Sequence, residues 1–151
     1  DDLRGVVGLG EAKIPVILAS LELARRYLLD SDQPIIDSPE KAVELLADIR
    51  DKKQEYFVCL TLDGANRLIA KRVVTIGTLT ASLVHPREVF ADAIADRAAS
   101  IIVAHNHPSG SLRPSQVDIT TTERLKHAGE LLGVPLVYHL LITKQSFRII
   151  D

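Results

Sequence analysis

The sequence predicts an α/β domain with a mixed sheet, preceded by a separate N-terminal helix. First, short apolar runs rich in β-branched residues, which are typical of strands, alternate with segments whose apolar residues recur at helical spacing. Second, hydrophobic residues make up 46% of the 151 residues, enough for one substantial core. Third, the polar stretch Ser31-Asp32-Gln33-Pro34 is typical of a linker. We therefore expect a helical segment with its linker at residues 1–33 and one main domain at residues 34–151.

The first half of the chain is expected to contain two helices and two strands. Apolar residues at helical spacing over residues 11–29 predict the first helix. Ser38-Pro39-Glu40 is typical of a helix start with proline at the first helical position, and this helix is expected to run to about residue 50. Strands are predicted near residues 55–63 and 67–78, because an Asp-Gly turn signal separates two runs of strand-forming residues.

The second half is expected to alternate helices with strands. A helix near residues 86–98 leads into a short buried strand at residues 100–105. Another helix is predicted over residues 115–132, after a loop that contains proline and glycine. Strands near residues 135–142 and 146–150 close the chain, and helices interleaved with strands in this order indicate an α/β domain.

Two histidines stand at the end of the strand predicted at residues 100–105, within the sequence His105-Asn106-His107-Pro108-Ser109-Gly110. Residues two apart in an extended chain project to the same side, so both imidazoles can meet one ion. Zinc accepts imidazole nitrogen and carboxylate oxygen, and a catalytic zinc site typically has three protein ligands. Taken alone, however, a histidine pair after a strand is more often polar surface than a metal site.

Ser115 and Asp118 lie at the start of the next predicted helix. Helix side chains tilt toward the N-terminus, so a carboxylate in the first turn can lean back toward the histidine pair and supply a third ligand. Ser115-x-x-Asp118 is also a capping-box pattern, and capping alone explains both residues. The complete string, H-x-H-x7-S-x-x-D, favours a metal site over a histidine pair and a helix cap that are unrelated.

That string resembles the signature of the JAMM (MPN-plus) zinc metalloproteases, and the surrounding sequence resembles the bacterial RadC branch. The resemblance covers about residues 34–151. It implies a three-layer α-β-α fold of the JAMM/MPN, cytidine-deaminase-like type, and a zinc-dependent hydrolase that acts on peptide or isopeptide bonds of a protein or peptide substrate. It rests on residues 82–90, on 105–110, on Pro114-Ser115 with Asp118, and on Leu125-Lys126 through Leu132-Gly133.

The resemblance also implies roles for individual residues. His105, His107 and Asp118 would bind zinc, and Ser115 would hold the nascent oxyanion or the zinc water. Glu55, which opens the strand predicted near residues 55–63, matches the family's general base, which takes a proton from the activated water and passes it to the leaving amine. The alternative for Glu55 is a solvated glutamate at a strand end.

One departure from the family pattern lies on the strand predicted at residues 135–142. RadC relatives usually have an aspartate before the histidine of this strand, whereas here Tyr138 precedes His139. The sequence therefore leaves the role of Tyr138 and His139 open.

Gly8-Leu9-Gly10-Glu11-Ala12-Lys13 precedes the first predicted helix and resembles the second half of a helix-hairpin-helix, a DNA-binding element of RadC proteins. Such glycines let backbone amides at a helix N-terminus meet phosphate. Only one helix of the pair fits, because seven residues precede Gly8. An ordinary turn before a helix is the alternative, and we expect no more than weak DNA association through this segment.

Composition argues against several other classes. Lys plus Arg number 18 against 20 Asp plus Glu, a net charge of −2, so no overall positive field attracts nucleic acid. The lone Cys59 is typical of a buried small hydrophobe, and the chain cannot form an internal disulfide, which suits a reducing cytoplasm. No segment resembles a signal peptide or a membrane span, so we expect a bacterial cytoplasmic protein.

Two functional classes remain. The first is a zinc metallopeptidase of the JAMM type, with Glu55 as general base and Ser115 as electrostatic helper. The second is a DNA-repair-associated module whose metal site is structural or unused. A structural zinc is more commonly closed by four Cys or His ligands, so three ligands with a nearby carboxylate base favour catalysis.

Overall fold

The structure, a computed structural model, describes residues 10, 12–28, 33–77 and 84–151. The chain divides into two compact units, Asp1–Gln33 and Pro34–Asp151. The first unit contains the helix α1 (Lys13–Leu28), so the predicted N-terminal helix is confirmed. Half of the segment that resembles a helix-hairpin-helix, namely residues 8, 9 and 11, lies outside the described residues.

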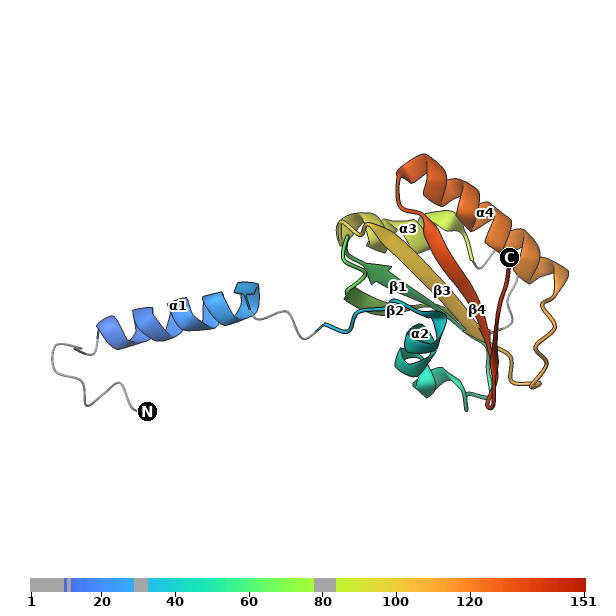
Figure 1. The fold of residues 1–151 in the computed structure, drawn as a ribbon, viewed down its shortest axis with the longest axis horizontal. Coiled ribbons are helices and arrows are strands. Elements are labelled where there is room, and N and C mark those ends of the chain that lie inside the picture. Colours follow the sequence, from blue (N-terminus) through green and yellow to red (C-terminus); the bar gives the residue numbers. More distant parts are fainter. Residues whose placement is uncertain (1–9, 11, 29–32, 78–83) are drawn as a thin grey trace. The chain divides into compact units, whose positions relative to one another are not determined.

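The second unit is built on a five-stranded mixed sheet (Figure 1). The strands occur in the spatial order β2-β1-β3-β4-β5. Only β3 and β4 run parallel, and the other neighbours are antiparallel. Their bounds are β1 (Tyr56–Leu62), β2 (Leu68–Ile76), β3 (Ser100–Asn106), β4 (Leu136–Ile142) and β5 (Phe147–Ile149). The strand β3 therefore lies at the centre of the sheet, and its carboxyl end carries the predicted histidine pair.

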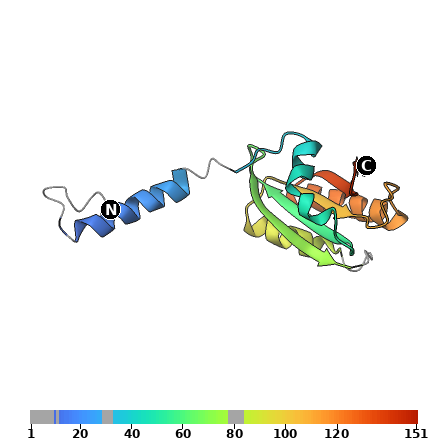
Figure 2. The same ribbon diagram turned by 90° about the horizontal axis from the view of Figure 1, so that it is seen from below.

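Helices cover both faces of this sheet (Figures 1 and 2). One face packs against α2 (Pro39–Leu45) and the short 3-10 helix η3 (Ala47–Ile49). The opposite face packs against α3 (Pro86–Ala95) and α4 (Gln116–Leu132). The predicted α/β class with three α-β-α layers is confirmed.

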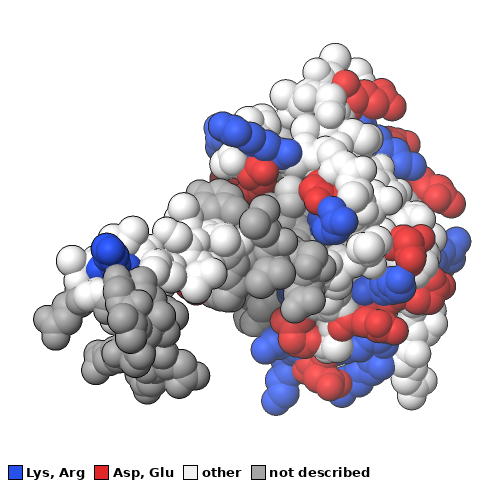
Figure 3. Space-filling view, turned by 60° about the vertical axis from the view of Figure 1, so that its left-hand side comes forward, with Lys and Arg blue, Asp and Glu red and all other residues white. Residues whose placement is uncertain are grey.

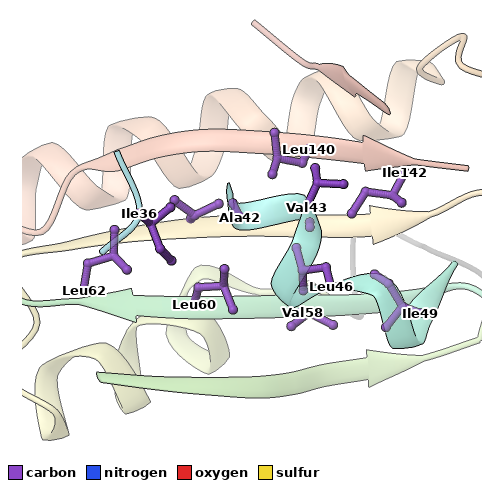
Figure 4. Close-up of a cluster of buried hydrophobic side chains, with 12 residues drawn as sticks. Ile36, Ala42, Val43, Leu46, Ile49, Val58, Leu60, Leu62, Leu140 and Ile142 are labelled. Atoms are coloured by element: carbon purple, nitrogen blue, oxygen red, sulfur yellow. The ribbon is translucent and has the colours of Figure 1, made fainter. Parts of the chain in front are cut away.

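The alternation of side chains along each strand produces two separate cores. Val58, Leu60 and Leu62 of β1 point toward α2, whereas Phe57 and Cys59 point toward α3 and α4. Figure 4 shows the first core, where side chains from α2 and η3 meet those of the sheet. Its buried residues are Ile36, Ala42, Val43, Leu46, Ile49, Val58, Leu60, Leu62, Ile102, Ala104, Leu140 and Ile142.

Two helices end earlier than the sequence predicts. The helix expected to reach residue 50 stops at Leu45, because Leu46 leaves helical geometry at φ −107° and ψ 15° and is buried in the core. The chain continues as the 3-10 turn of η3. The helix expected to reach residue 98 stops at Ala95, and Arg97 adopts a left-handed φ of 54°.

Charged side chains of both signs are interspersed on the face shown in Figure 3. This mixture agrees with the net charge of −2. Among the described helices, none combines the length and the apolar character needed to cross a bilayer.

Candidate metal centre

The three predicted metal ligands meet where β3 ends and α4 begins. The Nε2 atoms of His105 and His107 lie 3.2 Å apart. Asp118 Oδ1 lies 3.4 Å from His105 Nε2, and Asp118 Oδ2 lies 3.7 Å from His107 Nε2. One ligand atom from each of the three residues lies within 4.8 Å of the others. Two imidazole nitrogens and a carboxylate oxygen at this spacing can bind one metal ion.

The backbone between these ligands holds them in place. His107 N–H donates to the Ile142 carbonyl at 2.9 Å, which continues the pairing of β3 with β4 beyond Asn106. Gly110 N–H donates to the His107 carbonyl at 3.0 Å, and Gly110 has the positive φ of 78° that glycine adopts without strain. The chain therefore turns sharply after the histidines and returns to start α4 beside them.

His105 is fully buried and lies close to the rings of Phe57, His107 and His139. Phe57 stacks on it with ring centroids 6.2 Å apart and an interplanar angle of 11°. Burial lowers the pKa of His105 to about 4, an effect that the charge of Asp118 opposes and that of His107 reinforces. His105 is therefore neutral near pH 7 and retains a nitrogen lone pair for a metal.

The second nitrogens of both histidines have defined partners. His107 Nδ1 lies 3.0 Å from the Ser111 carbonyl, which can only accept, so Nδ1 carries a proton and Nε2 is the nitrogen that faces His105 and Asp118. His105 Nδ1 lies 2.9 Å from Nε2 of His139. His139 is buried at 1% exposure. It contacts His105 even though Tyr138 stands where RadC relatives usually have an aspartate.

The predicted capping box at the start of α4 is present. Ser115 Oγ accepts from Asp118 N–H at 3.2 Å, and Asp118 Oδ2 accepts from Ser115 N–H at 2.6 Å. Asp118 is 3% exposed, which leaves its carboxylate between the helix cap and the two imidazoles. The additional role of Ser115 in catalysis stays a prediction.

Glu55 lies immediately before β1, on the side of the sheet that carries His105. Its carbonyl accepts from Gly77 N–H at 2.8 Å, so the pairing of β1 with β2 continues to this residue. Phe57, two residues on, pairs with His105 in the sheet and stacks on its ring, and alternation places Glu55 on the same face. Glu55, Pro108 and Ser109 line one open pocket. The catalytic role of Glu55 stays a prediction.

Asn106 links the Glu55 segment to the end of β3, a role that no sequence pattern indicates. Its side-chain oxygen accepts from Tyr56 N–H at 2.7 Å. Its amide nitrogen donates to the carbonyls of Gln54 at 3.0 Å and of Lys52 at 3.4 Å. Because Asn106 alternates with the two histidines, strand geometry places its side chain on the opposite face of the sheet, but the sequence does not reveal its partners.

Comparisons with known proteins agree with this geometry. Residues 36–149 match the family model of the RadC-like JAB domain. A protein of Methanospirillum hungatei is 47% identical over 148 residues, which are 95% of this chain and 66% of that protein. A protein of Bacillus licheniformis is 47% identical over 150 residues, covering 97% and 67%, and one of Picosynechococcus is 45% identical over 149 residues, covering 97% and 61%. All three bear the name UPF0758 protein, and the chain spans about two thirds of their length or less.

Proposed function

This chain belongs to the RadC family of JAB-domain proteins, and on that premise we propose that it is a zinc-dependent hydrolase of peptide or isopeptide bonds. The observation that carries the proposal is the meeting of His105, His107 and Asp118 at the end of the central strand. Three protein ligands are the usual set of a catalytic zinc site, in which the fourth position is left for water or substrate.

The donor set fits zinc chemically. Both histidines are placed to present a ring nitrogen, and the carboxylate is almost fully buried between them. No fourth histidine, cysteine or acidic group joins this cluster among the residues that the structure describes. A structural zinc is usually closed by four such ligands, so the three-ligand set supports a catalytic site.

The chain's own residues supply the acid–base chemistry. When bound, zinc lowers the pKa of a water molecule and polarises a substrate carbonyl. Glu55 takes the proton of the attacking water and returns it to the leaving amine. The Ser115 hydroxyl donates a hydrogen bond to the oxyanion that develops on the carbonyl. The substrate is an unidentified protein or peptide that enters along the pocket lined by Glu55 and Ser109.

The test combines metal analysis with a cleavage screen. Elemental analysis of the zinc-treated protein should give one zinc per chain, and His107→Ala should lose it, because two remaining ligands hold zinc poorly. An unbiased library of peptides and isopeptides identifies a substrate. Glu55→Gln should retain zinc and lower hydrolysis by about 10²- to 10⁴-fold, whereas the exposed Glu130→Gln control should hydrolyse normally. Wild-type rates in Glu55→Gln would show that the mechanism is wrong.

The alternative is a DNA-repair-associated module with a structural or unused metal site. The mixed charges on the face in Figure 3 and the net charge of −2 offer no broad positive surface for a duplex. The three-ligand set also favours catalysis over this alternative.

The cytoplasmic location stays a prediction.

A further inference from the structure

A buried chain of hydrogen bonds runs behind the metal centre, from α4 through β4 to β3. The Thr122 hydroxyl lies 2.7 Å from the backbone carbonyl of Asp118 and 2.6 Å from His139 Nδ1. His139 Nε2 lies 2.9 Å from His105 Nδ1. Thr122 and His105 are 0% exposed and His139 is 1% exposed, so water does not compete for these bonds.

The chemistry of the groups fixes the direction of every bond in this chain. A carbonyl oxygen has no proton, so the contact with Asp118 uses the single proton of the Thr122 hydroxyl. Toward His139, the hydroxyl oxygen can then only accept, and His139 Nδ1 must carry the proton. A neutral imidazole has one N–H, so His139 Nε2 accepts from His105 Nδ1–H.

The surroundings of His139 keep it neutral. Its two nitrogens contact only the Thr122 hydroxyl and the His105 ring among the described partners, and the edge of Phe57 packs against its ring at 5.5 Å. The ring is almost fully buried, and burial disfavours the charged form of an imidazole. A charged imidazolium would have no carboxylate partner here, and an unpaired buried charge is costly.

We propose that Thr122 and His139 are positioning residues that hold His105 in the Nδ1–H tautomer before any metal binds. His105 Nε2 then has no proton, and its lone pair points at the space shared with His107 and Asp118. The tautomer of a metal-binding histidine is set by the hydrogen bond that its other nitrogen makes. The inference rests on the metal site of the proposed function and adds two residues that touch neither metal nor substrate.

The same chain of bonds also joins the elements that carry the ligands. Thr122 follows Asp118 by one helical turn and bonds to its carbonyl, while His139 reaches from β4 to His105 on β3. The helix that supplies the carboxylate and the strand that supplies the imidazole are therefore tied together through β4. Loss of such outer hydrogen bonds typically weakens metal binding by about 10- to 100-fold.

The direct test is the protonation of His105 in the metal-free protein. Long-range ¹H–¹⁵N correlation NMR distinguishes the two neutral tautomers of each of the five histidines. We expect His105 and His139 both to carry the proton on Nδ1 at pH 7.5. A proton on His105 Nε2 in the metal-free protein would overturn the inference.

Zinc affinity, measured by competition with a chelator, provides the second readout. His139→Leu should weaken binding by about 10- to 100-fold. His139→Gln should recover part of this loss, because its amide oxygen can accept from His105 Nδ1–H. Thr122→Val should also weaken binding, whereas Thr121→Val, at the neighbouring and likewise buried position, should not. Unchanged affinity in both His139→Leu and Thr122→Val would overturn the inference.

These experiments distinguish failure of the tautomer assignment from failure of the proposed zinc hydrolase. Wild-type protein that shows the Nδ1–H tautomer of His105 but binds no zinc would refute the zinc hydrolase and leave the tautomer assignment standing. Zinc binding and hydrolysis by a protein whose His105 is protonated at Nε2 in the metal-free state would refute the tautomer assignment and leave the zinc hydrolase standing. Thr122→Val and the wild-type spectrum keep the test decisive even if His139→Leu does not fold.

Discussion

Substitution of Asp118 should separate helix capping from metal binding, because one carboxylate takes part in both. Asp118 Oδ2 accepts from Ser115 N–H at 2.6 Å, while Oδ1 lies 3.4 Å from His105 Nε2. Asp118→Asn keeps an oxygen that can accept from Ser115 but removes the negative charge and the anionic ligand. Asp118→Ala removes both functions. The two variants should therefore differ in the metal-free protein and agree in their response to zinc.

The expected sizes follow from the two interactions. A hydrogen bond to a charged group contributes about 1.5–3 kcal/mol, so metal-free Asp118→Ala should lose about that free energy of unfolding. Asp118→Asn should lose less, because its amide oxygen preserves the cap. Free zinc at about 1,000 times Kd should stabilise the wild type by about 4 kcal/mol. A Kd raised about 100-fold in Asp118→Asn would reduce this gain to about 1.4 kcal/mol.

Thermal unfolding followed by circular dichroism measures both effects on chelator-treated protein, with and without buffered free zinc. A domain of this size shifts its Tm by about 4 °C per kcal/mol, so the wild type should gain about 15 °C with zinc. Asp118→Asn should gain about a third of that. A zinc-induced rise in Asp118→Asn equal to that of the wild type would show that Asp118 is not a ligand. Equal losses in metal-free Asp118→Asn and Asp118→Ala would show that its oxygen does not cap α4.

Three further outcomes are expected. Ser115→Ala should cost about 0.5–2 kcal/mol in urea unfolding through the lost cap and should lower turnover about 10²-fold or more; unchanged turnover would leave capping as its only role. Metal-free protein should lose about 3 kcal/mol of stability as pH falls from 6.5 to 4, because burial lowers the pKa of His105 to about 4 and the unfolded chain takes up the proton first. His139 adds to this loss in the same direction, and urea midpoints that do not move over this range would contradict it. Fluorescence anisotropy should show weak, salt-sensitive binding of this chain to duplex DNA, and tight binding at physiological salt would favour the repair module.

Local patterns in the sequence predicted most of the elements and the order in which they occur. The apolar β-branched run at residues 100–105 is β3, and Ser38 caps α2 as its sequence indicates. The end of α2 was missed because Leu46 fits the apolar spacing of a longer helix. Its non-helical backbone is a consequence of packing in the core, which a local pattern does not contain.

The candidate site shows the same division between local and distant information. His105, His107 and Asp118 lie within fourteen residues, so one motif was enough to predict that they meet. His139 is separated from His105 by 34 residues, and Asn106 from Tyr56 by 50. Their contacts depend on the register of β3 with β4 and with β1, which the spacing of residues along the chain does not reveal.

The helix cap has a consequence for the choice among divalent ions. Since Ser115 N–H donates to Asp118 Oδ2, this oxygen has one lone pair fewer for an ion, and Oδ1 is the freer of the two carboxylate oxygens. Calcium takes six to eight oxygen ligands and often binds a carboxylate through both oxygens, and magnesium prefers an octahedron of oxygens. Two imidazoles with a single carboxylate oxygen suit neither ion but suit zinc and its transition-metal neighbours. The two imidazoles thus disfavour the abundant alkaline-earth ions, and the cap at the start of α4 adds to this because its hydrogen bond competes with an ion for one carboxylate oxygen.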